Sequence, residues 1–296
     1  MKPPRIIHTS TLSIVGALTL ASHAAAQTEL AAQSSARPFG LDIIAPVYQA
    51  GSDTASASFQ DNDLPMLQAY LDDALGERET LNDVSSIALD PSKLKLNTTS
   101  DVRVYFIGEG AGYHNTLGIN TDGVGASEGN PQLIFPDASS RNSSFVNGDK
   151  TMGLRTNRLP LLPGDFVDLG TYGGGTQLDF FLIANGANGG SYTYTAHEDT
   201  NPDGIQHTVS FAIEGSPYLL IGFEDLYGGG DRDYNDILFA IDIGAHNVAH
   251  LANPEPSTML ILISFLGFIG WSKAKANKNT RAHAIVDLSS NKQTTS

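Results

Sequence analysis

Short runs of alternating apolar residues, separated by turn-forming residues, constrain the fold of this chain more than any other feature. Apolar side chains recur at every second position in three segments, residues 102–106, 207–213 (where His207 begins the row) and 237–243. Further short β-type runs cover residues 178–184, 192–195 and 218–223. Because successive side chains of a strand point to opposite faces, this pattern predicts half-buried strands. With turn signals between short strands and no strand–helix alternation, the chain should form an antiparallel β-sandwich.

One amphipathic helix precedes these strands. Leucines recur at three- and four-residue spacing from Leu64 to Leu75, after Asp63 as a capping residue and before Gly76 as a stop. We expect the leucine face to pack against the strands.

The first 26 residues have the pattern of a secretory signal peptide. Lys2 and Arg5 form a basic start, residues 12–20 contain a short apolar run, and three alanines at 24–26 predict cleavage before Gln27. A short buried helix is the alternative. The chain contains no cysteine, which excludes disulfide frameworks, thiolate nucleophiles and cysteine-ligated metals.

The C-terminal end contains a second apolar run, residues 257–271, between a Pro-Glu-Pro motif at 254–256 and a basic cluster at 273–281. Fifteen helical residues span about 22 Å, which is less than the ~30 Å hydrocarbon core of a bilayer. Such a segment crosses only where the bilayer thins, and the basic cluster would lie on the cytoplasmic side. The body of the protein would then lie outside the inner membrane.

Residues 254–281 resemble the PEP-CTERM sorting signal of Gram-negative bacteria that make extracellular polysaccharide. The resemblance implies transient anchoring in the inner membrane through residues 257–271, followed by processing by an exosortase-type membrane enzyme. The protein would then reach the cell surface or the extracellular polysaccharide. An ordinary C-terminal anchor would give the same topology without release.

The predicted fold class is all-β, a jelly-roll-like antiparallel sandwich with a short N-terminal helical segment and a C-terminal hydrophobic helix. In chain order, the predicted parts are a signal peptide (1–26), a leader with the helical segment (27–99), the sandwich domain (100–247), a linker (248–253), the sorting or anchor segment (254–281) and a polar tail (282–296).

Acidic residues dominate the chain between its two ends. The whole chain has a formal net charge of −15, and residues 27–253 keep 10 of the 17 basic and 30 of the 32 acidic residues, which leaves −20. This charge argues against a nucleic-acid partner, because phosphate contacts need clustered Lys and Arg. Divalent cations outside the cell are the obvious counter-ions for such a body.

The most informative segment is an acidic block within residues 222–242. Three of its oxygen-bearing side chains stand at alternate positions, as in the first half of a calcium loop, where alternate oxygens converge on one ion. A hard cation that takes 6–8 oxygen ligands fits this set better than zinc does. The candidate Ca²⁺ ligands are Glu224, Asp225, Asp231, Asp233, Asn235 and Asp236.

Turn chemistry is the alternative for this block, because Asp, Asn and Gly are common in β-turns. Five carboxylates between Glu224 and Asp236 are more than a turn requires, and Arg232 is the only base among them. Their repulsion calls for a counter-ion. The block is not an EF-hand, since Asp236 occupies the place of the required glycine and a strand follows it.

A weaker candidate precedes this block. Asp199, Asn201 and Asp203, followed by Gly204, match the first half of a calcium loop, but Ser210 stands where the last ligand should be. A plain turn explains the same residues equally well.

The acidic block also carries a family resemblance. Residues 223–236 resemble the F-E-D-L-x-G-G-G-D-x-D-Y/F-N-D hallmark of domain-of-unknown-function family 4114, with Tyr227 at the variable place. Residues 178–186 and, more loosely, 104–117 are also similar, so the resemblance covers roughly residues 100–245. It implies a secreted bacterial protein with a β fold, and it brings no activity and no catalytic residues.

Enzyme motifs are weak in this chain. Residues 125–129 match G-x-S-x-G, but the flanks are turn-like, whereas a nucleophile elbow needs a strand and a helix. No P-loop, dinucleotide fingerprint or H-E-x-x-H occurs. We therefore expect an exported, non-enzymatic calcium-binding module with extracellular polysaccharide as its partner. The alternative is a carbohydrate-active enzyme or carbohydrate-binding module on the same fold, with paired carboxylates as catalysts in the enzyme.

Overall fold

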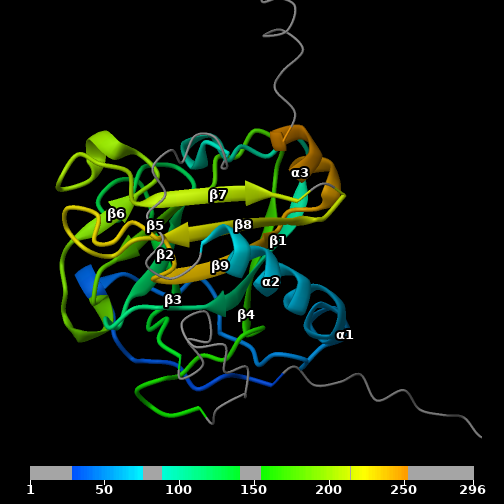
Figure 1. Ribbon diagram of the computed structural model, residues 1–296, viewed down its shortest axis with the longest axis horizontal. Coiled ribbons are helices and arrows are strands. Elements are labelled where there is room, and N and C mark those ends of the chain that lie inside the picture. Colours follow the sequence, from blue (N-terminus) through cyan, green and yellow to red (C-terminus); the bar gives the residue numbers. More distant parts are fainter. Residues whose placement is uncertain (1–28, 76–88, 141–154, 214, 253–296) are drawn as a thin grey trace, which may run out of the picture.

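The computed structural model describes residues 29–75, 89–140, 155–213 and 215–252. Its strands form two antiparallel sheets (Figure 1). The five-stranded sheet has the order β4-β1-β9-β8-β7 and contains β1 Ser100–Gly108, β4 Phe166–Tyr172, β7 Thr208–Ala212, β8 Tyr218–Phe223 and β9 Ile237–Asp242. The four-stranded sheet has the order β3-β2-β5-β6 and contains β2 Thr116–Asn120, β3 Gln132–Phe135, β5 Asp179–Ile183 and β6 Thr193–Thr195.

The two sheets share one hydrophobic core. Alternate residues of β1, β8 and β9 are buried together with alternate residues of β2 and β5. Phe180 of β5 and Phe239 of β9 meet there with ring centroids 5.3 Å apart. Removal of this apolar surface from water stabilises the fold by about 25 cal/mol per Å². The structure confirms a mostly β chain with two antiparallel sheets, and every predicted strand is present.

A helical layer covers the outer face of the five-stranded sheet (Figure 1). It runs through α1 Thr54–Ser58, the π-helical turn η2 Phe59–Asp63 and α2 Leu64–Ala74. Leu67 and Leu71 are fully buried against the sheet, which confirms the predicted leucine face. Asp63 does not cap this helix, because the chain is already helical before it. Asp53 is the cap instead, and its side chain accepts a hydrogen bond from the Ser56 amide at 2.6 Å.

The described part of the expected leader is built into the fold. Ala31 N donates to Val47 O at 2.8 Å, and Tyr48 forms an antiparallel bridge with Phe166 of β4. Between Ala31 and Val47 the chain turns through the short 3₁₀ helix η1 Pro38–Gly40. The described residues also contain the 3₁₀ helices η4 Pro91–Lys93, η5 Gly186–Asn188 and η6 Glu198–Thr200.

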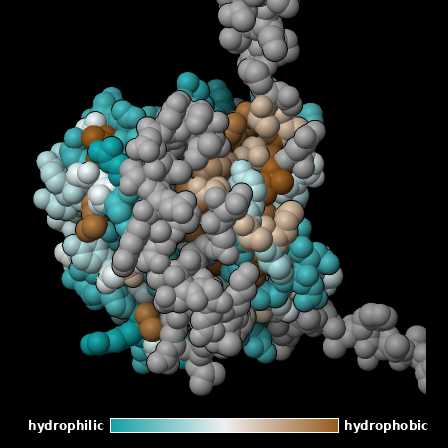
Figure 2. All heavy atoms as spheres, viewed as in Figure 1, coloured by the Kyte–Doolittle hydropathy of each residue, from teal (hydrophilic) through white to brown (hydrophobic). Residues whose placement is uncertain are grey.

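Helix α3, Ala245–Ala252, occupies most of the segment expected as a linker. It docks because Val248 is buried in the shared core and because the Asn247 side-chain oxygen accepts hydrogen bonds from the amides of Asn97 and Thr98, each at 2.9 Å. Figure 2 shows hydrophobic residues around α3 and the adjoining ends of β7 and β8.

Within the described residues, no helix combines the length and apolar character that a membrane crossing requires. The predicted signal peptide and the predicted sorting segment lie outside these residues.

Candidate metal centre

The acidic block connects two central strands of the five-stranded sheet. β8 and β9 pair along their whole length, and Phe223 at the end of β8 faces Ile237 at the start of β9. Residues 224–236 therefore leave and re-enter the sheet at one point, as the yellow loop at the left of Figure 1. Since both strands are central and buried, the two ends of the loop are held firmly.

Five of the predicted ligands converge at this point. Carboxylate oxygens of Glu224, Asp231 and Asp233 lie within 4.8 Å of one another. A second group within the same limit contains Glu224, Asp225 and Asp236. Glu224, Asp225 and Asp233 are at most 4 % exposed, whereas Asp231 is exposed to solvent. Carboxylates from both ends of the loop thus form one acidic cluster, which we call the acidic centre.

An unusual backbone path presents these side chains. Gly230, Arg232 and Tyr234 all have positive φ angles, of 46°, 61° and 56°. For a non-glycine residue this conformation costs roughly 1 kcal/mol or more, and such strain is typical of ligand clamps. Gly230 also admits the Glu224 carboxylate, because a Cβ there would lie only 2.2 Å from Glu224 Oε1.

The electrostatics of the acidic centre disfavour ionisation. Burial, followed by the neighbouring charges of Asp225 and Glu224, raises the pKa of Asp236 to about 10. Burial also raises the pKa of Glu224 to about 7 and moves the pKa of Asp225 upward. In addition, Glu224 Oε2 is buried and has no hydrogen-bond partner within the described chain. A cation would satisfy this oxygen and bring all these pKa values down.

Asn235 lies beside these carboxylates and supports one of them. Its side-chain nitrogen donates to Asp233 Oδ2 at 3.0 Å, and its backbone oxygen accepts from Gly110 N at 2.9 Å. Its side-chain oxygen packs against Gly110, where a Cβ would lie 2.3 Å away. Asn235 therefore orients Asp233 and anchors the loop to the segment after β1.

Sequence reasoning missed two polar residues of this region. Asn115, just before β2, donates its side-chain amide to Asp225 Oδ2 at 2.7 Å. Glu109 follows β1 directly and is 5 % exposed, with Oε1 accepting from Ser140 N at 2.8 Å. Burial raises the pKa of Glu109 to about 8, opposed by backbone hydrogen bonds and assisted by the charges of Asp137 and Asp225. No sequence spacing reveals them, because the pairing of β1 with β9 places Glu109 beside the acidic block and a long-range side-chain contact places Asn115 there.

The weaker candidate loop is organised by hydrogen bonds. Asp199 is exposed, and the Asn201 side chain accepts from Thr195 N at 2.7 Å and donates to Ile205 O at 2.8 Å. Neither Asp199 nor Asp203 belongs to a carboxylate group of the kind found in the acidic centre, among the residues described. This bonding pattern is the one that a plain turn predicts.

Asp203 connects that loop to the acidic block through a buried histidine. Asp203 Oδ2 accepts from Gly228 N at 2.7 Å and lies 2.9 Å from His207 Nε2. The other ring nitrogen of His207 lies 2.9 Å from the backbone oxygen of Glu224, and the ring stacks on Tyr194 at 3.7 Å. His207 thus positions the start of the acidic block through the Glu224 backbone oxygen.

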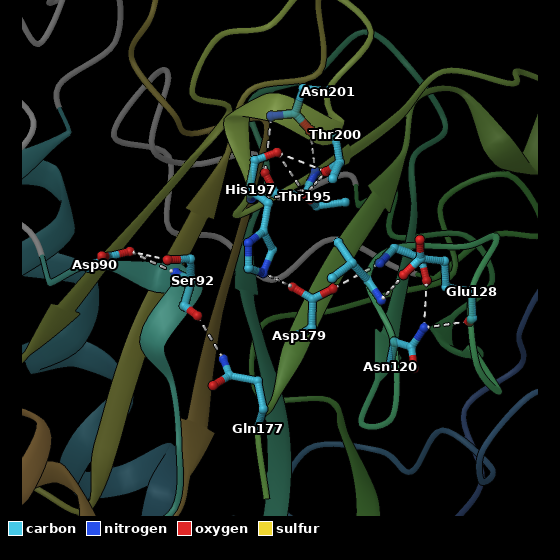
Figure 3. Close-up of polar contacts among 12 residues, drawn as sticks. Asp90, Ser92, Asn120, Glu128, Gln177, Asp179, Thr195, His197, Thr200 and Asn201 are labelled. Atoms are coloured by element: carbon cyan, nitrogen blue, oxygen red, sulfur yellow. Dashed lines mark hydrogen bonds and ion pairs between the residues drawn. The ribbon is translucent and has the colours of Figure 1, made fainter.

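A separate buried carboxylate, Asp179 of β5, supports the loop that contains the G-x-S-x-G match. Its Oδ2 accepts from Gly125 N at 2.8 Å, and its Oδ1 lies 3.5 Å from His197 Nε2 (Figure 3). Asn120 closes the same loop by donating to the backbone oxygens of Gly125 and Glu128. This loop joins β2 to β3, so the motif lacks the strand-to-helix turn of a nucleophile elbow.

The family comparison covers the acidic centre. The model of the family described as Domain of unknown function (DUF4114) matches residues 173–244. This match supports the predicted resemblance over β5 to β9, and residues 100–172 lie outside it. No curated protein and no solved structure matches the chain.

Proposed function

We propose that this chain is an exported, non-enzymatic calcium-binding module, a jelly-roll-like β-sandwich sorted to the cell surface or the extracellular polysaccharide matrix. The observation that supports it best is the convergence of five carboxylates at the ends of β8 and β9. Buried at this density, the carboxylates repel one another, and the cost is relieved when a hard divalent cation joins them. An all-oxygen set suits Ca²⁺, which accepts 6–8 oxygens in flexible geometry.

Thermal unfolding of the purified chain in calcium, magnesium or chelator tests this proposal. Extracellular calcium modules bind with dissociation constants of ~10⁻⁴–10⁻³ M. Because the unfolded chain scatters the ligands, calcium at 100 times the dissociation constant should add about 2.7 kcal/mol. This corresponds to roughly 5–10 °C for a domain of this size. Magnesium should substitute poorly, since it requires compact octahedral coordination and releases water reluctantly.

Asp233→Ala separates a metal site from a hydrogen-bonded turn. The variant should lose the calcium response and, in chelator, be at least as stable as wild type, because removing one crowded charge should offset the lost hydrogen bond from Asn235. Asp61→Ala removes an exposed carboxylate on η2 and is the matched control, which should keep the response. Identical melting of wild type in calcium and chelator, with Asp233→Ala merely destabilised, would refute calcium binding.

The export part of the proposal rests on the terminal sequence patterns. We propose that the signal peptide at 1–26 directs export and that residues 257–271 anchor the chain transiently in the inner membrane. An exosortase-type enzyme then processes the segment at 254–281. A reporter after residue 296 should be cytoplasmic before processing, and one before residue 254 should not be. Mature surface protein should lack residues 273–296, so an intact C-terminus would contradict processing.

A carbohydrate-binding role is the second candidate, favoured by one observation. Tyr192 and Tyr227 are 53 % and 60 % exposed, and their rings lie 5.7 Å apart beside the acidic centre. Exposed aromatic faces carry a negative quadrupole that attracts the C–H face of a sugar ring. Affinity electrophoresis against a panel of polysaccharides should show retardation that Tyr227→Ala removes, whereas Tyr113→Ala, which removes another exposed tyrosine, should retain it. Equal mobility of all three proteins in every gel would exclude this role.

A further inference from the structure

We propose that the acidic centre holds two divalent cations, an outer ion and an inner ion, bridged by the Glu224 carboxylate. This inference rests on the proposed calcium-binding function and specifies its stoichiometry and ligand sets. The outer ion takes Asp231 and Asp233, and the inner ion takes Asp225 and Asp236.

The geometry separates the ligands into two sets. Each of the two carboxylate groups fits within 4.8 Å, which suits oxygens around one ion at Ca–O distances of about 2.3–2.6 Å. Glu224 is the one residue common to both groups. A carboxylate has two oxygens, so a shared one bridges neighbouring cations, as in two-metal sites with ions about 3.5–4 Å apart.

The state of Glu224 is an independent observation that points to a cation. The residue is 1 % exposed, and its Oε2 is buried without a hydrogen-bond partner among the described residues. A buried carboxylate oxygen left unsatisfied is costly, and cation coordination removes that cost. Oε1 lies against Gly230, at the start of the segment that carries Asp231 and Asp233.

Charge supports two ions rather than one. The acidic centre contains five carboxylates, and Arg232, the nearest base in sequence, is exposed. Once all five carboxylates are ionised, as metal binding requires, one divalent cation leaves three negative charges uncompensated in a largely buried place, whereas two leave one. Buried charges are tolerated only when paired, so the second cation accounts for the remaining carboxylates.

Exposure predicts that the two ions differ. Asp231 is exposed and opens the outer set to solvent, whereas the inner set is more enclosed, because Asp225 is buried and Asp236 is half-buried. The outer ion should therefore exchange faster and should be removable by changing Asp231 alone.

Native mass spectrometry and equilibrium dialysis of the purified full chain with Ca²⁺ test the inference. Wild type should bind two ions, Asp231→Asn one, and Glu224→Gln neither at the same calcium concentration. Asp61→Asn is the charge-matched control and should bind two. Circular dichroism in chelator checks that each variant is folded, and exposed Asp231 is the safest position for this purpose.

The outcomes distinguish the two levels of the proposal. One ion in wild type, or two ions in Asp231→Asn, would overturn the bridged pair while leaving the proposed calcium-binding function intact. No bound ion in wild type would overturn both.

Discussion

Gly230 offers the sharpest single test of how the acidic centre is built. An alanine Cβ at this position would lie 2.2 Å from Glu224 Oε1, and the nearest atoms are the far end of that flexible side chain. The carboxylate must therefore move by about 1 Å to restore an ordinary contact. The fold can accept this movement, but a metal ligand cannot, because Ca–O distances are confined to about 2.3–2.6 Å.

The expected effect of Gly230→Ala separates stability from affinity. The positive φ of 46° makes alanine cost roughly 1 kcal/mol in the absence of metal. Displacing a ligand through its supporting contact typically lowers metal affinity 10- to 100-fold. At a calcium concentration that adds about 2.7 kcal/mol to wild type, a hundredfold weaker variant gains only about 0.4 kcal/mol.

Gly228→Ala is the matched control. Its φ is +84°, so the backbone cost is similar, but a Cβ there meets no atom within 4 Å. In chelator, urea unfolding should show both variants destabilised by the same amount. Calcium titration should show a lower calcium affinity only for Gly230→Ala. Equal calcium affinity in the two variants would show that Glu224 does not bind the ion from this position.

Three further changes test other parts of the structure. The pKa of Glu109 is about 8 in the folded state and ordinarily 4.5, so this residue should lower the stability of wild type by about 1.4 kcal/mol per pH unit between those values. Urea unfolding in chelator should show that Glu109→Gln lacks this contribution. Parallel pH profiles of the two proteins would contradict the prediction. Burial raises the pKa of Asp203, but hydrogen bonds from Gly228 and His207 prevail and lower it. Asp203→Asn should therefore cost ~1–3 kcal/mol of unfolding free energy at pH 7 and less below pH 3.8. The variant should keep the stabilisation by calcium, and losing it would make Asp203 a ligand. Leu67→Ala should cost ~2–5 kcal/mol in chemical denaturation, and a cost below 1 would mean that α2 does not cover the sheet.

Local patterns predicted much of the fold. Strands β7 and β9 were predicted because one row of their side chains is apolar and alternates along the segment. β2 shows no alternation because both of its faces are covered. Its Gly118 lies under the ring of Phe181 in β5, where a Cβ would lie 2.2 Å from the ring. Gly118 is required by the ring of a residue 63 positions away in the sequence, so it gives no local signal for a strand.

In the candidate site, too, local patterns could be predicted and long-range contacts could not. The alternate spacing of Asp231, Asp233 and Asn235 is a local pattern, and the sequence therefore predicted the acidic block. Glu109 and Asn115 adjoin it because β1 pairs with β9 and because Asn115 reaches Asp225, a contact across 110 residues. Asn235 shows a further limit of spacing, since it has the expected position but orients Asp233 with its amide. Spacing predicts which residues meet, and tertiary packing decides which of their atoms face the acidic centre.

The position of the acidic centre links its charge to the stability of the whole sheet. Residues 224–236 join β8 and β9, and these two strands hold β1 and β7 on either side. Repulsion among buried carboxylates therefore acts where the central pair of strands begins, and opening there would expose apolar residues of the shared core. A cation that binds only the folded arrangement removes this repulsion and stabilises the folded state by its binding free energy. With the dissociation constants of ~10⁻⁴–10⁻³ M that are typical of extracellular calcium modules, this contribution would be available only where calcium is abundant. For a chain exported as we propose, the sheet would reach its full stability after it leaves the cell.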